Sequence, residues 1–240
     1  MSIIHASIIP ELNEQLVSQE AIVNAIQEIE GELYFMKPET IVVMQASSNE
    51  ADSISVSVAE CIADEVGQCV MRNDLPLVMH IKAAMNKSEH ANWLYLEASK
   101  EIDVGIRKSL TTLCAHIPKI KYVHIQLPVA SKQFPLSDLR LAGHMIGSVL
   151  LSSNARIALI AAGRATVAED IFYGRLQKAV VQNNFMELNE TPLDGAAISS
   201  FETTIYTFLS AFHDTLFDSR LLHNEIIDGN HVMIADLTMS

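Results

Sequence analysis

The chain has few of the residues that cross-link, break or rigidify a polypeptide. Its 240 residues include three cysteines, seven prolines, nine glycines and one tryptophan. Three cysteines without metal-ligand spacing exclude a disulfide framework and a zinc site, so we expect Cys61, Cys69 and Cys114 to be reduced core thiols of a cytosolic protein. With 49% hydrophobic and 19% charged residues, the composition indicates a compact globular chain rather than a disordered one.

Basic residues are also scarce, with 16 lysines and arginines against 29 acidic residues, which gives a net charge of −13. An acidic surface repels phosphate backbones and anionic lipid, so nucleic-acid and membrane partners are disfavoured. No apolar run reaches the roughly 18 residues of a membrane span, and the start of the chain lacks the basic region of a signal peptide. We therefore expect a cytoplasmic protein.

Several familiar catalytic and nucleotide-binding motifs are missing. The sequence has no Gly-x-Ser-x-Gly elbow, no Gly-x-Gly-x-x-Gly fingerprint and no Walker loop. Ala162-Gly163-Arg164 closes a predicted strand before a helix, where backbone N–H groups and Arg164 could hold an anion. The alternative for this segment is a plain β–α turn.

Hydrophobic periodicity predicts strands alternating with helices over the whole chain. The expected strands span 2–9, 40–46, 52–58, 77–81, 121–127 and 156–162, and the expected helices span 13–36, 87–100, 104–117, 135–151, 168–182 and 194–217. The tail predicts a hairpin in which 221–227 and 231–237 pair across Asp228-Gly229-Asn230. Alternating strands and helices indicate one α/β domain that covers residues 1–240.

Five segments, taken in order, resemble the LigB-type superfamily of class III extradiol ring-cleavage dioxygenases and Memo-like proteins. The most specific match is 37–58, which resembles a pattern of Pro-(Asp/Glu)-Thr, a hydrophobic strand and Ser-Pro-His. The other matching segments are 2–10, 102–105, 156–167 and 224–237. The resemblance implies a LigB-like, phosphorylase/hydrolase-like α/β fold, with a central mixed β-sheet flanked by helices.

The resemblance also implies where a metal site would lie, because these dioxygenases hold Fe(II) with two histidines and a glutamate. The two metal histidines correspond to Glu11 and Ser47, and the glutamate corresponds to Glu225, which is kept. Two further family histidines, one of them the acid/base of ring opening, correspond to Val104 and Val167. Valine cannot accept a proton, and a serine hydroxyl is a poor ligand for Fe(II).

We therefore expect a degenerate relative that has lost the iron site and has no catalytic residues or cofactor. Its pocket at the strand ends would bind a small molecule or a protein partner, lined by Glu11, Ser47, Asp103, Val104, Arg164, Val167 and Glu225. The alternative is an enzyme acting on a small aromatic substrate, with Mg²⁺ or Ca²⁺ at Glu11 and Glu225 and a contribution from His5 or His231. A third possibility is a non-catalytic subunit of an active dioxygenase.

The sequence alone does not determine the oligomeric state. The helix expected to carry Phe201, Ile205 and Phe208 on one face could belong to the core or to the interface of a homo-oligomer.

Overall fold

The computed structural model describes residues 2–47, 53–63, 69–87, 91–98, 104–117, 119–166, 170–189, 198–212 and 217–239. The strands are β1 (Ile3–Ile9), β2 (Thr40–Ser47), β3 (Ile54–Ser57), β4 (Cys61–Ala63), β5 (Cys69–Asn73), β6 (Leu94–Glu97), β7 (Lys121–Pro128), β8 (Ile157–Ala162), β9 (Ala165–Thr166), β10 (Phe217–Ile227) and β11 (Asn230–Met239). The helices are α1 (Glu14–Val17), α2 (Glu20–Met36), α3 (Leu75–Asn86), α4 (Val104–Leu113), α5 (Leu136–Ser152), α6 (Asp170–Gln182), α7 (Met186–Asn189) and α8 (Ser200–Ser210), with a 3₁₀ turn at Ala91–Trp93.

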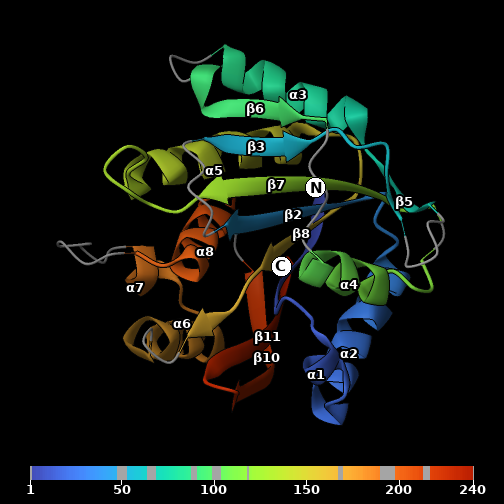
Figure 1. Cartoon of the computed structure of the whole chain (residues 1–240), viewed down its shortest axis with the longest axis vertical. Coiled ribbons are helices and arrows are strands. Elements are labelled where there is room, and N and C mark those ends of the chain that lie inside the picture. Colours follow the sequence, from blue (N-terminus) through green and yellow to red (C-terminus); the bar gives the residue numbers. More distant parts are fainter. Residues whose placement is uncertain are drawn as a thin grey trace.

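Within these ranges, eleven strands form one mixed sheet whose main order is β10-β11-β1-β8-β2-β7-β3-β6. Figure 1 shows this order from β6 at the top to β10 at the bottom. The four central strands β1, β8, β2 and β7 run parallel, whereas β10 and β11 pair antiparallel at one end. The predicted fold class, a single α/β domain with a mixed sheet flanked by helices, is confirmed.

The parallel core places the carboxyl ends of β1, β8, β2 and β7 at one edge of the sheet. Thr40 pairs with Lys121 and Met44 with Ile125, so β2 and β7 keep an unbroken register toward that edge. We call it the carboxyl edge, because ligands of open α/β sheets bind outside the carboxyl ends of the strands.

Helices bury both faces of the sheet. α3, α5, α6 and α8 pack on one face, and α1, α2 and α4 pack on the other. Phe201, Ile205 and Phe208 of α8 are all buried, so this helix belongs to the core in the described chain rather than to an exposed interface.

Two predicted elements are wrong. Residues 77–81 lie in α3 instead of a strand, because the Asp74 side chain caps the helix by accepting from the Leu77 N–H, and Pro76 occupies its first turn. A short apolar run does not distinguish a buried strand from a buried helix. Part of the helix expected over 87–100 is strand β6, which pairs in parallel with β3.

The sequence analysis also missed the β4–β5 hairpin and overextended one helix. α8 covers Ser200–Ser210, where a capping box between Ser199 and Glu202 starts it, and Phe217 already belongs to β10. The rest of the segment predicted as helix 194–217 falls partly outside the described residues. Cys69 on β5 is exposed, so the expectation of core thiols is wrong for this cysteine.

The closing hairpin is confirmed with its predicted turn. Ile227 pairs with Asn230, and the two residues between them, Asp228 and Gly229, have φ angles of 49° and 72°. Asp-Gly supplies the left-handed conformations that a two-residue turn of this kind requires.

None of the described helices combines the length and apolar character that a membrane crossing requires.

Two glycines of α5 set its distance from α8. A Cβ atom added at Gly143 would lie closer than 3 Å to the Thr207 carbonyl of α8, and one added at Gly147 would lie as close to the carbonyl of Ala211. Both obstacles are backbone atoms, which cannot turn aside as a flexible side chain can. The absence of side chains at these positions therefore permits the close approach of the two helices.

We expect Gly147→Ala to lower the free energy of unfolding by about 1–3 kcal/mol, because the added methyl group forces α5 and α8 apart. The matched control is Gly174→Ala in α6, where an added Cβ meets nothing within 4 Å. That change should instead stabilise the chain by about 0.5–1 kcal/mol, through helix propensity. Urea unfolding measures both values, and equal effects of the two substitutions would contradict the packing explanation.

Candidate functional site

A chain of four polar side chains crosses the carboxyl edge of the sheet. His124 of β7 lies with Nε2 at 3.2 Å from Oε1 of Gln45 on β2. The Gln45 amide donates to Oε1 of Glu11 at 2.8 Å, and Nη2 of Arg164 lies 3.5 Å from the other Glu11 oxygen. We call Glu11, Gln45, His124 and Arg164 the carboxyl-edge site.

Backbone contacts hold the two charged members in place. Glu11 follows β1 between Pro10 and Leu12, and the buried Ser109 hydroxyl of α4 donates to the Pro10 carbonyl at 3.0 Å and accepts from the Leu12 N–H at 3.1 Å. Arg164 follows Gly163, whose N–H donates to the Ile9 carbonyl of β1 at 3.2 Å. This hydrogen bond joins the ends of β1 and β8 next to the Glu11–Arg164 ion pair.

Small residues on β8 let Glu11 reach Gln45 across an intervening strand. β8 lies between β1 and β2, and its last residue, Ala162, pairs with Ile9. Ala162 is fully buried and carries one methyl group, so it leaves room above the strand for the carboxylate. A longer side chain on this face would separate Glu11 from Gln45.

The hydrogen-bond directions within the site are fixed by the donor and acceptor atoms. A carboxylate accepts only, so the Gln45 NH₂ group must face Glu11 and its carbonyl oxygen must face His124. Nε2 of His124 therefore carries a proton and donates. The site joins an acid, an amide and an imidazole in one polarised chain, with the Arg164 guanidinium at its end.

The site is partly open to solvent at its charged end. The side chains of Arg164 and Glu11 are 36% and 20% exposed, whereas Gln45 and His124 are buried. A ligand arriving at the edge would therefore meet the guanidinium first, and the amide and imidazole would lie deeper.

Polar character continues from the site along one face of the sheet. Gln126 of β7 pairs with Gln45 on one side and with Ser55 of β3 on the other, and all three residues are buried. On the same strands, the residues that point to the opposite face, Val56 and Ile125, belong to the apolar core. A buried row of amides and hydroxyls is costly unless partners satisfy it, so this part of the sheet departs from the requirements of packing alone.

The structure brings together two of the residues predicted from the sequence, Glu11 and Arg164. Val104 is the first residue of α4 and is 66% exposed. Ser47 is the last residue of β2 and pairs with Pro128 at the carboxyl edge. Asp103 and Val167 lie outside the described residues.

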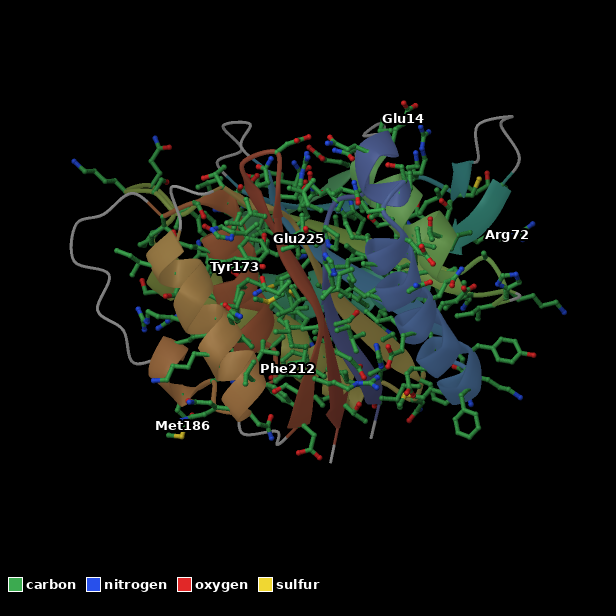
Figure 2. The ribbon with its side chains drawn as sticks, turned by 90° about the horizontal axis from the view of Figure 1, so that it is seen from below. Glu14, Arg72, Tyr173, Met186, Phe212 and Glu225 are labelled. Atoms are coloured by element: carbon green, nitrogen blue, oxygen red, sulfur yellow. The ribbon has the colours of Figure 1, made fainter. Side chains whose placement is uncertain are left out.

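Glu225 lies on β10, at the end of the sheet, and its side chain is 60% exposed. Figure 2 views the molecule from below, with β10 and β11 running between α6 and α2 and Glu225 labelled on them. Oε2 of Glu225 is 3.7 Å from Nε2 of His223 on the same strand. β11 lies between β10 and β1, so Glu225 is separated from the strand that leads to Glu11.

His231 does not join Glu225 across the hairpin. Val232 is the pairing partner of Glu225, and His231 pairs with Ile226 instead. Because neighbouring residues of a strand point to opposite faces, Glu225 and His231 point apart. The His231 ring stacks on Tyr173 of α6 at a centroid distance of 4.0 Å.

The donor set around Glu11 decides whether a metal ion fits there. In the described parts of the chain, no three His, Cys, Asp or Glu side chains gather in a group that could hold a metal ion. Both Glu11 oxygens already face donors, and one of these donors is a guanidinium whose positive charge opposes a divalent cation. The described residues do not fit an iron or two-carboxylate metal centre at Glu11.

His5 belongs to a separate buried cluster on β1 and β11. Its Nδ1 lies 3.4 Å from Oδ1 of Asp236, and both side chains are almost completely buried. The other Asp236 oxygen faces Arg220 at 3.2 Å, and Arg220 also pairs with Glu28 of α2 at 2.5 Å. Burial lowers the pKa of His5, and the negative charge of Asp236 partly opposes this shift.

A groove of about 770 Å³ lies at the opposite ends of the strands, between α3, α5 and the start of β7. Its rim carries His80, Lys87 and Lys121, and its base includes Asp74. The Asp74 carboxylate already caps α3, accepts from the Thr40 hydroxyl at 2.6 Å and faces Lys121 at 3.7 Å. Asp74 and Lys121 are thus engaged within the fold, and the carboxyl-edge site is the stronger functional candidate.

Gln45 and His124 are the site residues that the sequence analysis missed. A usable signal existed, because alternation along 40–47 places Gln45 on the face of Ile41 and Val43, where an apolar residue is expected. His124 interrupts the apolar strand 121–127 in the same way. Two polar interruptions on adjacent buried strands indicate a site only when their pairing is known.

Comparisons with known proteins inform the fold alone. No protein-family model and no curated protein matches the sequence. Among solved structures, the chain is similar to the uncharacterized protein JW3007 from Escherichia coli K12, with a TM-score of 0.69 and 13% sequence identity. The match covers 98% of this chain and 99% of that chain, so the two share the fold over their full lengths.

The His5 cluster predicts a pH-dependent stability. His5 is neutral in the folded chain, whereas in the unfolded chain it binds a proton below an ordinary pKa of about 6.5, so the free energy of unfolding should fall as the pH drops below that value. One such proton contributes a slope of up to about 1.4 kcal/mol per pH unit. In His5→Gln this slope should decrease.

His80→Gln is the matched control, because His80 is exposed on α3 and its removal should leave the slope unchanged. Urea unfolding between about pH 5 and pH 7.5 spans the ordinary imidazole pKa and measures both variants. An unchanged slope in His5→Gln would rule out His5 as its source.

Proposed function

We propose that the chain is a degenerate LigB-like protein that binds a small molecule at the carboxyl-edge site without a metal. The single observation that carries this proposal is the engaged state of Glu11. The resemblance aligns this position with an iron-binding histidine, yet its two oxygens face Gln45 and Arg164. A carboxylate held in this way organises a polar site instead of presenting free lone pairs to iron.

The site chemistry suits a small aromatic acid that carries hydroxyl groups. Arg164 offers a planar guanidinium at the open end, which matches a carboxylate. Gln45, Gln126 and His124 supply amide and imidazole groups further along the same face, where hydroxyl groups find both donors and acceptors. Such a ligand keeps the substrate class that the LigB resemblance implies, while ring cleavage is lost.

The loss of ring cleavage follows from residues at three other positions. Ring opening by this family needs Fe(II) with open positions for substrate and oxygen. Ser47, Val104 and Val167 stand at positions where the family has histidines, and none of them replaces an imidazole as a ligand or base. The proposed activity is therefore binding rather than oxygenation.

Metal content separates this proposal from an enzyme with a rebuilt centre. Protein purified without chelator should contain no stoichiometric Fe, Mn, Zn, Cu, Mg or Ca by elemental analysis. Glu225→Ala should leave that result unchanged, as should the control Glu39→Ala, which removes an exposed glutamate paired with Arg156. Near-unity metal that disappears in Glu225→Ala but not in Glu39→Ala would support the enzyme and overturn the proposal.

Binding of 3,4-dihydroxybenzoate, measured by calorimetry, tests the ligand class. Arg164→Ala should weaken binding by about 10- to 100-fold, the effect of losing a hydrogen bond to a charged group. The matched control is Arg156→Ala, because Arg156 precedes β8 as Arg164 follows it, and it pairs with an exposed glutamate in a similar way. Equal affinities of both variants, or oxygen uptake on adding the probe, would contradict binding at this site.

A further inference from the structure

Two of the three cysteines face each other on the β4–β5 hairpin. Cys69 is the pairing partner of Ala63, and the register shifts between Ile62 and Ala63, so Cys61 and Cys69 lie diagonally across the two strands. Their side chains are close enough to share a hydrogen bond.

The surroundings of this pair differ from those of Cys114, although Cys61 and Cys114 are both partly exposed. Cys69 is exposed and Cys61 is partly exposed, so small reagents in water can reach both. Cys114 packs against the apolar core beneath α2 and α4, where burial raises the pKa of its thiol. Reactive cysteines are accessible ones, whereas a cysteine held in apolar surroundings is inert.

The two thiols of the pair are chemically unequal. The hydrogen bond with Cys69, together with desolvation, raises the pKa of Cys61 to about 11, so Cys61 stays protonated near neutral pH. A protonated thiol is a poor nucleophile but can donate its proton. Cys69, which is the more exposed, is therefore the residue suited to attack an incoming electrophile, with Cys61 held beside it to react second.

We propose that Cys61 and Cys69 are a redox pair that closes reversibly into an intramolecular disulfide when a hydroperoxide reacts with Cys69. In the first step the Cys69 thiol gives up its proton, and the thiolate attacks the peroxide O–O bond and forms a sulfenic acid. The hydroxide or alkoxide that leaves takes up that proton and is released as water or an alcohol. Oxidation of Cys69 removes the thiol that holds the Cys61 proton by a hydrogen bond. In the second step the Cys61 sulfur displaces hydroxide from the sulfenic acid, and the Cys61 proton leaves with the hydroxide as water. The two thiols lose two electrons to the peroxide, and a dithiol reductant restores them.

The hairpin setting favours the second step over side reactions. Sulfenic acids are oxidised further unless a thiol lies within reach, and the diagonal neighbour supplies one. Asn73, at the end of β5, donates to the Ser57 carbonyl at 2.8 Å and pairs with Tyr122 of β7, which anchors the hairpin to the sheet. This proposal does not depend on the carboxyl-edge site or on its ligand.

The experiment uses the full chain, reduced and then treated with hydrogen peroxide. Free thiols should fall from the three cysteines of the sequence to one, the intact mass should decrease by two hydrogen atoms, and dithiothreitol should restore both. Trypsin cannot locate the bond, since no lysine or arginine lies between Cys61 and Cys69. Cleavage at Glu65 by a glutamate-specific protease separates the two cysteines unless the disulfide joins them.

Single cysteine variants show which cysteine reacts with the peroxide and which then closes the disulfide. Cys114→Ser should form the disulfide at the same rate as the parent chain. Cys61→Ser should stop at a Cys69 sulfenic acid that dimedone traps, and Cys69→Ser should lose the fast peroxide reaction, with circular dichroism confirming that each variant is folded. Retention of three thiols after peroxide, a bond between two chains, or trapping by dimedone at Cys61 in place of Cys69 would overturn the proposal.

Discussion

The parallel hydrogen bonding of β1, β8, β2 and β7 is the constraint on which the rest of the molecule depends. Four strands that are far apart in the sequence end at one edge only because their backbone groups pair in this order and direction. The pairing sets the register of each strand, so the side chains of Gln45 and His124 come within hydrogen-bond distance. It also places the end of β1 next to the end of β8. The carboxyl-edge site has no local origin, because its members come from four separate segments.

The two faces of this sheet differ in the buried residues that they carry. Beneath α3, α5, α6 and α8 the core is apolar and tightly packed, to the point that Gly143 and Gly147 bring α5 against the backbone of α8. Beneath α1, α2 and α4, the apolar residues give way to buried polar groups toward the carboxyl edge and along β1 and β11. Burial of polar groups lowers stability unless they are paired. The buried polar groups beside the edge where α/β proteins bind ligands are therefore consistent with function more than with packing.

Glu11 is the residue that joins the two halves of the carboxyl-edge site. One of its oxygens accepts from the Gln45 amide, and the other faces the Arg164 guanidinium. Both oxygens of the carboxylate therefore already face donors within the site. Glu225, the one metal-ligand residue that the LigB resemblance keeps, lies on an exposed strand with His223 and takes no part in this site.

The sequence by itself determined the α/β class, the closing Asp-Gly hairpin, most of the strands that form the sheet, and Arg164 as a residue at a strand end. These follow from local properties, namely the period of the apolar residues and the backbone preferences of glycine, proline and aspartate. It failed at 77–81 and at 87–100, where a short apolar run or a helix-like spacing suited more than one element. Tertiary structure alone decided that Gln45 and His124 join Glu11 and Arg164, that Glu225 stands apart, and that Cys61 meets Cys69. Each of these outcomes depends on strand order and register, and register is a property of two paired segments that neither segment contains by itself.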